Sequence, residues 1–261
     1  MKRWLLLRGL MRDARHWGAF PSRLQQNFPG AEVLCLDLPG NGGRCHIPSP
    51  ASIAGMLDAC RGDPLLLGRR ERFGIIAMSL GAMVATEWAA RYPQEVSALV
   101  LVNTSMRPFS PFHQRLRPAN YMRILRLLGS GNTADIERAV LALTSRHRRD
   151  DAALLANWCG WRDAQPVTRA NVLRQLLAAA RYRAPAVSLS VPTLLLASAQ
   201  DALVSVRCSE EIAARWRAPL QVHPDAGHDL PLDDADWVVR RISEWLQAAG
   251  TQPAVAQDQS P

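Results

Sequence analysis

The chain has 261 residues, enough for one large hydrophobic core or for a core with an inserted subdomain. With 48% hydrophobic and 21% charged residues it has the composition of an ordinary globular protein. No apolar run approaches the roughly 20 residues of a membrane-spanning helix, which excludes a helical membrane protein. The five cysteines are scattered and form no C-x-x-C pair. They predict neither a disulfide framework nor a zinc site, and they favour a reducing cytoplasm.

The net charge of +8 is concentrated in one segment. Residues 106–190 contain 14 arginines and 5 acidic residues, whereas the rest of the chain contains 17 basic and 18 acidic residues. Lys2 is the only lysine, so compositional bias explains part of the arginine count. The positive charge therefore belongs to a single region.

Strand and helix patterns alternate along the first hundred residues. The basic, apolar start mimics a signal peptide, but Arg8, Arg12 and Asp13 follow without a small-residue cleavage site, so it is interpreted as a strand. The expected strands are 4–7, 32–37, 73–77 and 98–102, and the expected helices are 20–28, 52–60 and 80–91. A glycine-rich stretch, 38–43, is predicted to be a loop. This alternation predicts the α/β class, with a mostly parallel sheet and helices on both faces.

Residues 106–190 interrupt the alternation. Pro108, Pro111 and Pro118 open the segment, and no strand pattern follows. Helical apolar spacing recurs four times, at 121–128, 136–143, 154–158 and 172–180, with Thr168 as a candidate cap of the last helix. The segment is predicted to form a helical cap inserted between two strands.

The alternation resumes after the predicted cap. A strand is expected at 191–197, a helix at 209–216, a short strand at 220–223 and an amphipathic helix at 234–248. Residues 250–261 are polar and lack an apolar period, which predicts a disordered tail. The expected organisation is a core formed by 1–105 and 191–249, a cap formed by 106–190, and a tail from 250.

Ser79 lies between the strand at 73–77 and the helix at 80–91, in the sequence Ala77-Met78-Ser79-Leu80-Gly81. Small residues two positions before and after the serine allow the strand and the helix to approach closely. A serine on such a turn projects its hydroxyl from the sheet edge, beside the N–H groups of a helix N-terminus. We predict that Ser79 is a nucleophile. The alternative is a serine that only caps the helix.

A serine nucleophile needs a histidine base and a carboxylate that orients it. Asp201 lies four residues beyond the strand at 191–197, and His228 follows the strand at 220–223. Both positions are loops after strands, where catalytic groups of parallel sheets gather. Asp225 is the alternative orienting carboxylate. A helix-capping aspartate and a surface histidine are the structural alternatives.

With these residues the chain resembles the α/β-hydrolase superfamily over about residues 3–249. The resemblance depends on four motifs in order: Arg8-Gly9-Leu10-Met11, Asp37-Leu38-Pro39-Gly40, Ala77-Met78-Ser79-Leu80-Gly81, and Asp201 with Gly227-His228. It implies that the backbone N–H groups of Leu10 and Leu80 form the oxyanion hole. Two departures are Arg8-Gly9 in place of the usual His-Gly, and Ala77 where glycine is commoner. Size and cap place the chain near small bacterial carboxylesterases, such as those acting on a pimeloyl-carrier-protein methyl ester.

The resemblance and the residues together predict a serine esterase that needs no cofactor or metal. Two alternatives use the same triad: a thioesterase or acyltransferase acting on a carrier-linked acyl group, and a C–C bond hydrolase. A catalytically silent binding protein of the same fold is the non-enzyme alternative. A serine at the elbow argues against dehalogenase or epoxide-hydrolase chemistry, which needs a carboxylate there.

The predicted cap supplies the candidates for substrate and partner recognition. Trp158 and Trp161 are candidates for lining an acyl pocket, although a tryptophan on such a helix is more often a packing residue. The arginines of the cap could receive an acidic acyl-carrier protein or an acidic substrate, or could form a solvated face. No nucleic-acid recognition motif is present, and the charge is dispersed over several helices, so no nucleic-acid partner is expected.

Overall fold

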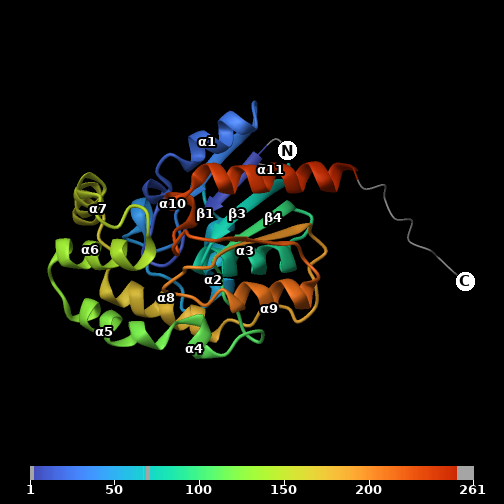
Figure 1. Ribbon diagram of the computed structural model, residues 1–261. Coiled ribbons are helices and arrows are strands. Elements are labelled where there is room, and N and C mark those ends of the chain that lie inside the picture. The colour runs from blue at the N-terminus through green and yellow to red at the C-terminus, as the bar shows by residue number, and fades with distance from the viewer. Residues whose placement is uncertain (1–2, 67, 69–70, 252–261) are drawn as a thin grey trace, which may run out of the picture.

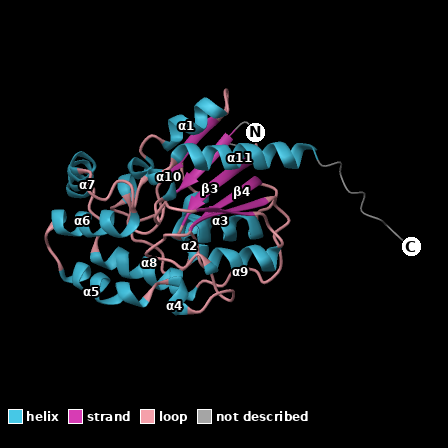
Figure 2. Ribbon diagram, in the orientation of Figure 1, coloured by secondary structure: helices cyan, strands magenta, loops and turns pink. Residues whose placement is uncertain are grey.

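The computed structural model describes residues 3–66, 68 and 71–251. At its centre, in the described part of the chain, six parallel strands form one sheet of order β2-β1-β3-β4-β5-β6 (Figures 1 and 2). The strands are β1 (Arg3–Leu7), β2 (Glu32–Leu36), β3 (Phe73–Met78), β4 (Val96–Val102), β5 (Thr193–Ser198) and β6 (Leu220–His223). The α/β class and the parallel sheet are confirmed. Since β3 lies between β1 and β4, the residue that follows it emerges near the middle of the sheet.

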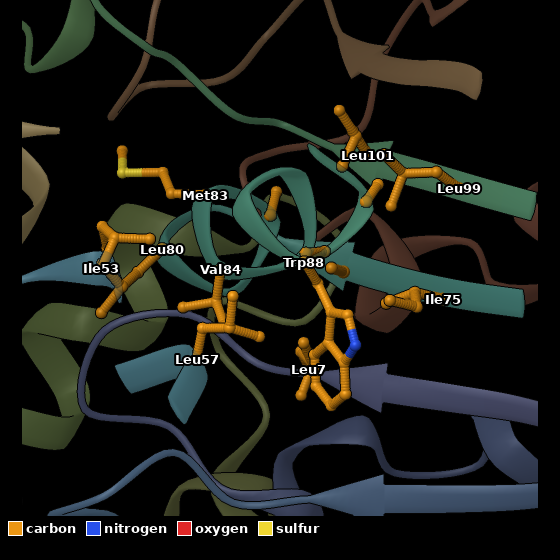
Figure 3. Close-up of a cluster of buried hydrophobic side chains, with 14 of the residues drawn as sticks. Leu7, Ile53, Leu57, Ile75, Leu80, Met83, Val84, Trp88, Leu99 and Leu101 are labelled. Carbon is orange, nitrogen blue, oxygen red and sulfur yellow. The ribbon is translucent and has the colours of Figure 1, made fainter. Parts of the chain in front are cut away.

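The sheet is buried on both faces because its strands are apolar at successive positions. In β1, Leu5 and Leu7 belong to one buried cluster, whereas Trp4 and Leu6 belong to a second cluster on the opposite face. The first cluster, shown in Figure 3, contains residues of α2 (Ile53–Arg61), α3 (Leu80–Arg91) and α9 (Arg207–Trp216). The second contains residues of α1 (Phe20–Asn27) and α11 (Ala235–Thr251). Each fully buried leucine or isoleucine contributes about 1.5–3 kcal/mol.

A group of helices follows β4 and precedes β5, as predicted from residues 106–190. They are α4 (Phe112–Arg115), η3 (Pro118–Asn120), α5 (Tyr121–Gly129), α6 (Thr133–Thr144), α7 (Ala152–Ala164) and α8 (Arg169–Arg181). Figure 1 shows α5, α6 and α7 gathered at one end of the sheet. The Thr168 hydroxyl accepts the Asn171 N–H at 3.1 Å, so the predicted cap of α8 is present. The four-residue α4 and three-residue η3 were not predicted, because so few residues establish no apolar period.

Two contacts attach these helices to the core. Ala178 of α8 and Tyr182, directly after it, belong to the first buried cluster. The buried Arg115 side chain donates hydrogen bonds to the carbonyls of Ala179 (2.6 Å) and Ala180 (3.5 Å), near the C-terminus of α8. A cation at that end satisfies carbonyls that lack an intrahelical partner.

Three short helices complete the fold in the described residues. They are η1 (Ala14–Trp17), η2 (Gly42–Arg44) and α10 (Leu230–Asp233). The stretch 38–43 is therefore loop only up to Gly42, where a short 3-10 helix begins. α11 extends to Thr251, two residues into the predicted tail, and residues 252–261 lie outside the described residues. No helix within the described ranges is long and apolar enough to cross a membrane.

Gly81 allows β1 and α3 to lie in contact. A Cβ atom at this position would lie 2.5 Å from the Arg8 carbonyl oxygen and 2.6 Å from that of Leu7. We expect Gly81→Ala to lower the free energy of unfolding by about 3 kcal/mol, because the clash is with backbone. Gly160→Ala, in α7, meets no atom within 4 Å and is expected to raise stability by about 0.5–1 kcal/mol. Urea unfolding measures both, and equal effects of the two substitutions would contradict this explanation.

Candidate active site

Ser79 occupies a strained turn between β3 and α3. Its φ of 52° and ψ of −114° are rarely adopted by non-glycine residues and cost about 1–3 kcal/mol. Two hydrogen bonds hold the turn: the Ser79 N–H donates to the Val102 carbonyl at 3.0 Å, and the Thr104 hydroxyl donates to the Ser79 carbonyl at 3.0 Å. Strain that the surrounding structure maintains in this way is typical of functional positions.

His228 and Asp201 are brought together although 27 residues separate them. The His228 Nδ1 atom lies 2.7 Å from Asp201 Oδ2, and both residues are only 3% exposed. The other carboxylate oxygen, Oδ1, accepts the backbone N–H groups of Leu203 (2.7 Å) and Val204 (2.9 Å). Each oxygen of Asp201 therefore has a separate task, one orienting the imidazole and the other fixing the carboxylate.

Asp225, the alternative orienting carboxylate, lies elsewhere. It is exposed, and it pairs with Arg146 at 3.0 Å and with His147 at 3.0 Å. These surface pairs leave Asp201 as the only carboxylate bonded to His228 within the described residues.

Asn103 is a positioning residue that sequence reasoning missed. Its side-chain N–H group donates to the His228 carbonyl (2.7 Å) and to the Ser198 hydroxyl (3.0 Å), and its oxygen accepts the Ser198 N–H (2.8 Å). It therefore joins the ends of β4 and β5 to the loop of His228. The available signal was a polar residue directly after an apolar strand.

A buried ion pair links the loops on either side of the site. Arg8 Nη1 and Nη2 bond Asp229 Oδ1 and Oδ2 at 3.0 Å and 2.5 Å, with the side chains 3% and 2% exposed. The Arg8 guanidinium also lies 4.9 Å from the centre of the Trp17 ring. Burial alone would raise the pKa of the Asp229 carboxyl, but the charge and hydrogen bonds of Arg8 outweigh it and hold this pKa below its ordinary value. In the sequence, Arg8 stands out only because it replaces the usual histidine of a motif. Nothing in the sequence predicts its ion pair with Asp229.

Ser79 and His228 line one cavity of about 190 Å³. Gly9 and Leu10, after β1, form part of the same wall, and a Cβ at Gly9 would lie 3.1 Å from the Ser79 Cβ. Leu80 is the first residue of α3, so its N–H has no intrahelical acceptor. The helices between β4 and β5 contribute an apolar wall. It consists of residues of α5, α6 and α8: Ile124, Leu127, Ile136, Val140, Leu143, Val172 and Leu176. The cavity therefore brings Ser79, the candidate nucleophile, and His228, the candidate base, to one apolar chamber.

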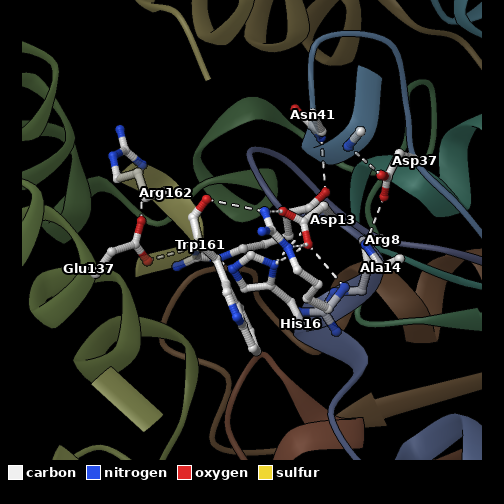
Figure 4. Close-up of polar contacts among 12 residues, drawn as sticks. Arg8, Asp13, Ala14, His16, Asp37, Asn41, Glu137, Trp161 and Arg162 are labelled. Atoms are coloured by element: carbon white, nitrogen blue, oxygen red, sulfur yellow. Dashed lines mark hydrogen bonds and ion pairs between the residues drawn. The ribbon is translucent and has the colours of Figure 1, made fainter. Parts of the chain in front are cut away.

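Trp158 and Trp161, the candidates for lining an acyl pocket, do not line this cavity, and the packing alternative describes both. Their rings lie 5.3 Å and 5.2 Å from that of His16, and Trp158 also lies beneath the Arg12 guanidinium at 4.2 Å. Both tryptophans therefore pack against the segment that follows β1. Figure 4 shows Trp161 beside His16 within a network of polar contacts.

His16 makes the stability of the protein depend on pH. Burial, together with the positive charge of Arg12, lowers the pKa of His16 from 6.5 to about 4. As the pH falls below 6.5, His16 binds a proton in the unfolded chain before it does so in the folded protein. The contribution of neutral His16 to the free energy of unfolding is therefore fully present above pH 6.5 and declines towards pH 4. The loss reaches at most about 3 kcal/mol. Urea unfolding between pH 7 and pH 4 should give a steeper decline for the wild type than for His16→Gln. Parallel curves would contradict the prediction.

Comparison with known proteins identifies the fold family. A family model described as the alpha/beta hydrolase fold matches residues 5–235. The chain belongs to the α/β-hydrolase fold family. Two similar relatives are RutD proteins of Shigella flexneri and Klebsiella pneumoniae, whose names describe them as carbamate hydrolases. Both are 27% identical to this chain, the first over 245 residues and the second over 246. Each alignment covers 89% of this chain and 86% of the relative. The chain is thus a hydrolase of the α/β fold.

Solved α/β hydrolases have the same architecture. A hydrolase from Pseudomonas aeruginosa superposes with a TM-score of 0.76 at 21% identity, covering 94% of this chain and 89% of that one. A thermophilic esterase from Thermogutta terrifontis gives 0.74 at 23% identity, covering 96% and 91%. An enol-lactonase from Burkholderia xenovorans gives 0.76 at 18% identity, covering 94% and 91%. At these identities the likeness concerns the fold.

Proposed function

We propose that this α/β hydrolase cleaves carboxylic esters through an acyl-enzyme on Ser79. The observation that supports this most directly is the buried contact of 2.7 Å between His228 Nδ1 and Asp201 Oδ2, beside the cavity that Ser79 also lines. In the proposed tautomer Nδ1–H donates a hydrogen bond to Asp201, so His228 Nε2 has a lone pair that can accept the proton of a hydroxyl. That tautomer is the one a general base requires.

The proposed reaction has two halves. In the first, Ser79 Oγ attacks the ester carbonyl as His228 takes its proton, and the alcohol leaves with that proton. In the second, water gives a proton to His228 as it attacks the acyl carbonyl. His228 then returns this proton to Ser79 Oγ as the bond to the acyl group breaks and the acid leaves. The N–H groups of Leu10 and Leu80 are proposed to hold the oxyanion, each contributing roughly 2.7–4 kcal/mol to transition-state stabilisation. Arg8 replaces the usual histidine without removing a backbone donor.

A fluorophosphonate reagent tests the nucleophile directly. The wild type should be labelled covalently, and Ser79→Ala should not be labelled. Ser145→Ala is a suitable control, because Ser145 is buried near α6 and bonds Asp233. An unlabelled wild type would favour the alternative of a silent binding protein.

The acyl donor is decided by a substrate panel. We expect p-nitrophenyl esters to be cleaved with higher kcat/KM than acyl thioesters or C–C bond substrates of equal acyl length. Higher kcat/KM for carrier-linked thioesters would favour the thioesterase or acyltransferase alternative. Carbamates belong in the panel as a second candidate, since the names of the RutD relatives assign them that activity.

We also propose that the cap receives an acidic acyl-carrier protein in the cytoplasm, where free thiols persist. All five cysteines, each within the described residues, are free. α5 exposes Arg123 and Arg126 beside Met122 and Leu125, which are 60% and 59% exposed. Cationic groups around apolar side chains suit an acidic protein partner. Raising salt should lower kcat/KM for a carrier-linked ester more than for a neutral short ester, and equal salt dependence would contradict the proposal.

A further inference from the structure

Three buried or half-buried charged side chains beside the cavity have no part in the proposed reaction. Arg12 follows the loop of Leu10, Glu137 belongs to α6 and Arg162 to α7. Arg12 Nη1 bonds Glu137 Oε2 at 2.6 Å, and Arg162 Nη1 bonds Glu137 Oε1 at 3.0 Å. Figure 4 shows Arg162 directed at Glu137. Both arginines line the cavity that contains Ser79.

This group carries one net positive charge. Glu137 is 1% exposed. Burial alone would raise the pKa of its carboxyl, but the charges of Arg12 and Arg162 outweigh this effect, and the pKa lies below its ordinary value. The carboxyl is therefore ionised at neutral pH, and it neutralises only one of the two guanidinium groups.

The neighbouring groups do not supply the missing negative charge. His16 Nε2 lies 3.1 Å from Arg12 Nη1, and with a pKa of about 4 the ring is neutral at pH 7. Asp13 is paired with Arg15 at 2.7 Å. Asp37 accepts backbone N–H groups at 2.7 Å and 2.9 Å (Figure 4), and its hydrogen bonds go to neither Arg12 nor Arg162. The second positive charge of the Arg12–Glu137–Arg162 group is therefore not paired with any of these three side chains.

Arg12 is also incompletely hydrogen-bonded. The residue is 7% exposed, and its Nη2 atom is buried without a hydrogen-bond partner in the described part of the chain. Stacking on Trp158 at 4.2 Å offsets part of the lost hydration. An excess cation in the interior is costly, and a buried Arg–Glu–Arg group is a poor source of stability. Its position on the wall of a substrate cavity indicates a role in binding an anion.

We propose that Arg12 and Arg162 bind a carboxylate on the acyl part of the substrate, so that the preferred substrates are half-esters of dicarboxylic acids. The inference rests on the proposed esterase function and specifies its substrate class. Arg12 lines the same cavity as Leu10 and Ser79, so a substrate whose ester lies at Ser79 can present its carboxylate to Arg12 within that cavity. A cavity of ~150 Å³ admits benzene, so the chamber here of about 190 Å³ suits a short acyl chain.

The test compares matched esters of equal length. Monomethyl esters of dicarboxylic acids, with about four to eight carbon atoms in the acyl part, are assayed against the same esters with the free carboxylate replaced by a primary amide. The wild type should prefer the acid in kcat/KM by about 10- to 100-fold, the range for one hydrogen bond to a charged group. A ratio near one would overturn the inference.

Variants assign the preference to Arg12. Arg12→Gln should reduce the acid-to-amide ratio about tenfold or more, mainly through KM, and Arg12→Lys should retain part of the ratio. Arg174→Gln removes one charge from an exposed position of α8 and should leave the ratio unchanged. If Arg12→Gln and Arg174→Gln changed the ratio equally, the effect would come from the general charge of the cap and the assignment would fail.

Two further measurements separate this inference from the esterase proposal. Dicarboxylic acids should raise the Tm of Ser79→Ala and inhibit the wild type competitively, whereas the corresponding diamides, which lack a carboxylate, should do neither. This experiment measures binding without turnover, and it does not depend on whether Arg12→Gln folds. Cleavage of amide-bearing esters without an acid preference would overturn only the inference. Absence of both labelling and ester cleavage would overturn the esterase function, and absence of dicarboxylate binding would then overturn the inference as well.

Discussion

Asp201→Asn is expected to lower kcat for ester hydrolysis by about 10⁴-fold with little change in the fold. The Leu203 and Val204 N–H groups both donate to Oδ1, so they will hold the amide oxygen of the asparagine. The amide N–H₂ must then face His228 Nδ1, which has to become an acceptor. The proton moves to Nε2, and the imidazole loses the lone pair that would accept the Ser79 proton.

Asp225→Asn is the matched control, since it makes the same chemical change in an exposed carboxylate three residues before His228. It should change kcat less than about twofold. A comparable loss in both variants would mean that Asp201 does not orient the base. Steady-state kinetics on one p-nitrophenyl ester, with thermal unfolding of each variant, measure both effects.

Breaking the Arg8–Asp229 pair is expected to cause the largest loss of stability at the site. Asp229→Asn leaves the Arg8 guanidinium buried without a counter-charge, and should lower the free energy of unfolding by about 3–5 kcal/mol. Because Arg8 precedes Gly9 and Asp229 follows His228, kcat should fall as well. Urea unfolding and the rate of fluorophosphonate labelling measure the two effects.

The double variant Arg8→Met with Asp229→Asn tests whether charge causes the loss. Removing both charges should restore most of the stability lost by Asp229→Asn, because no isolated ion is then buried. The Arg3–Glu32 pair is a suitable comparison, since Glu32 is 38% exposed. Breaking it with Arg3→Gln should cost about 1 kcal/mol or less. If the two charge losses in the double variant were additive, the pair would not be a coupled unit.

Local sequence patterns predicted most of the elements that position the site. The apolar run before Ser79 is buried between two layers of helices. Gly81 lets α3 contact the end of β1 because it has no Cβ. Asp201 and His228 were found because the carboxyl ends of parallel strands meet at one edge. The role of the two tryptophans of α7 stayed open between pocket lining and packing. An apolar period gives the angle of a side chain about its helix axis, but it does not tell which neighbour the helix packs against.

The sequence alone therefore determined the class of fold and the residues able to form a nucleophile, a base and an orienting carboxylate. These follow from periodicity and chain order, which are local properties. The tertiary structure decided which charges are buried together. Arg8 is 221 positions from Asp229, and Arg12 is 125 positions from Glu137. Such pairings depend on how the cap docks on the sheet, and no spacing in the chain encodes that docking.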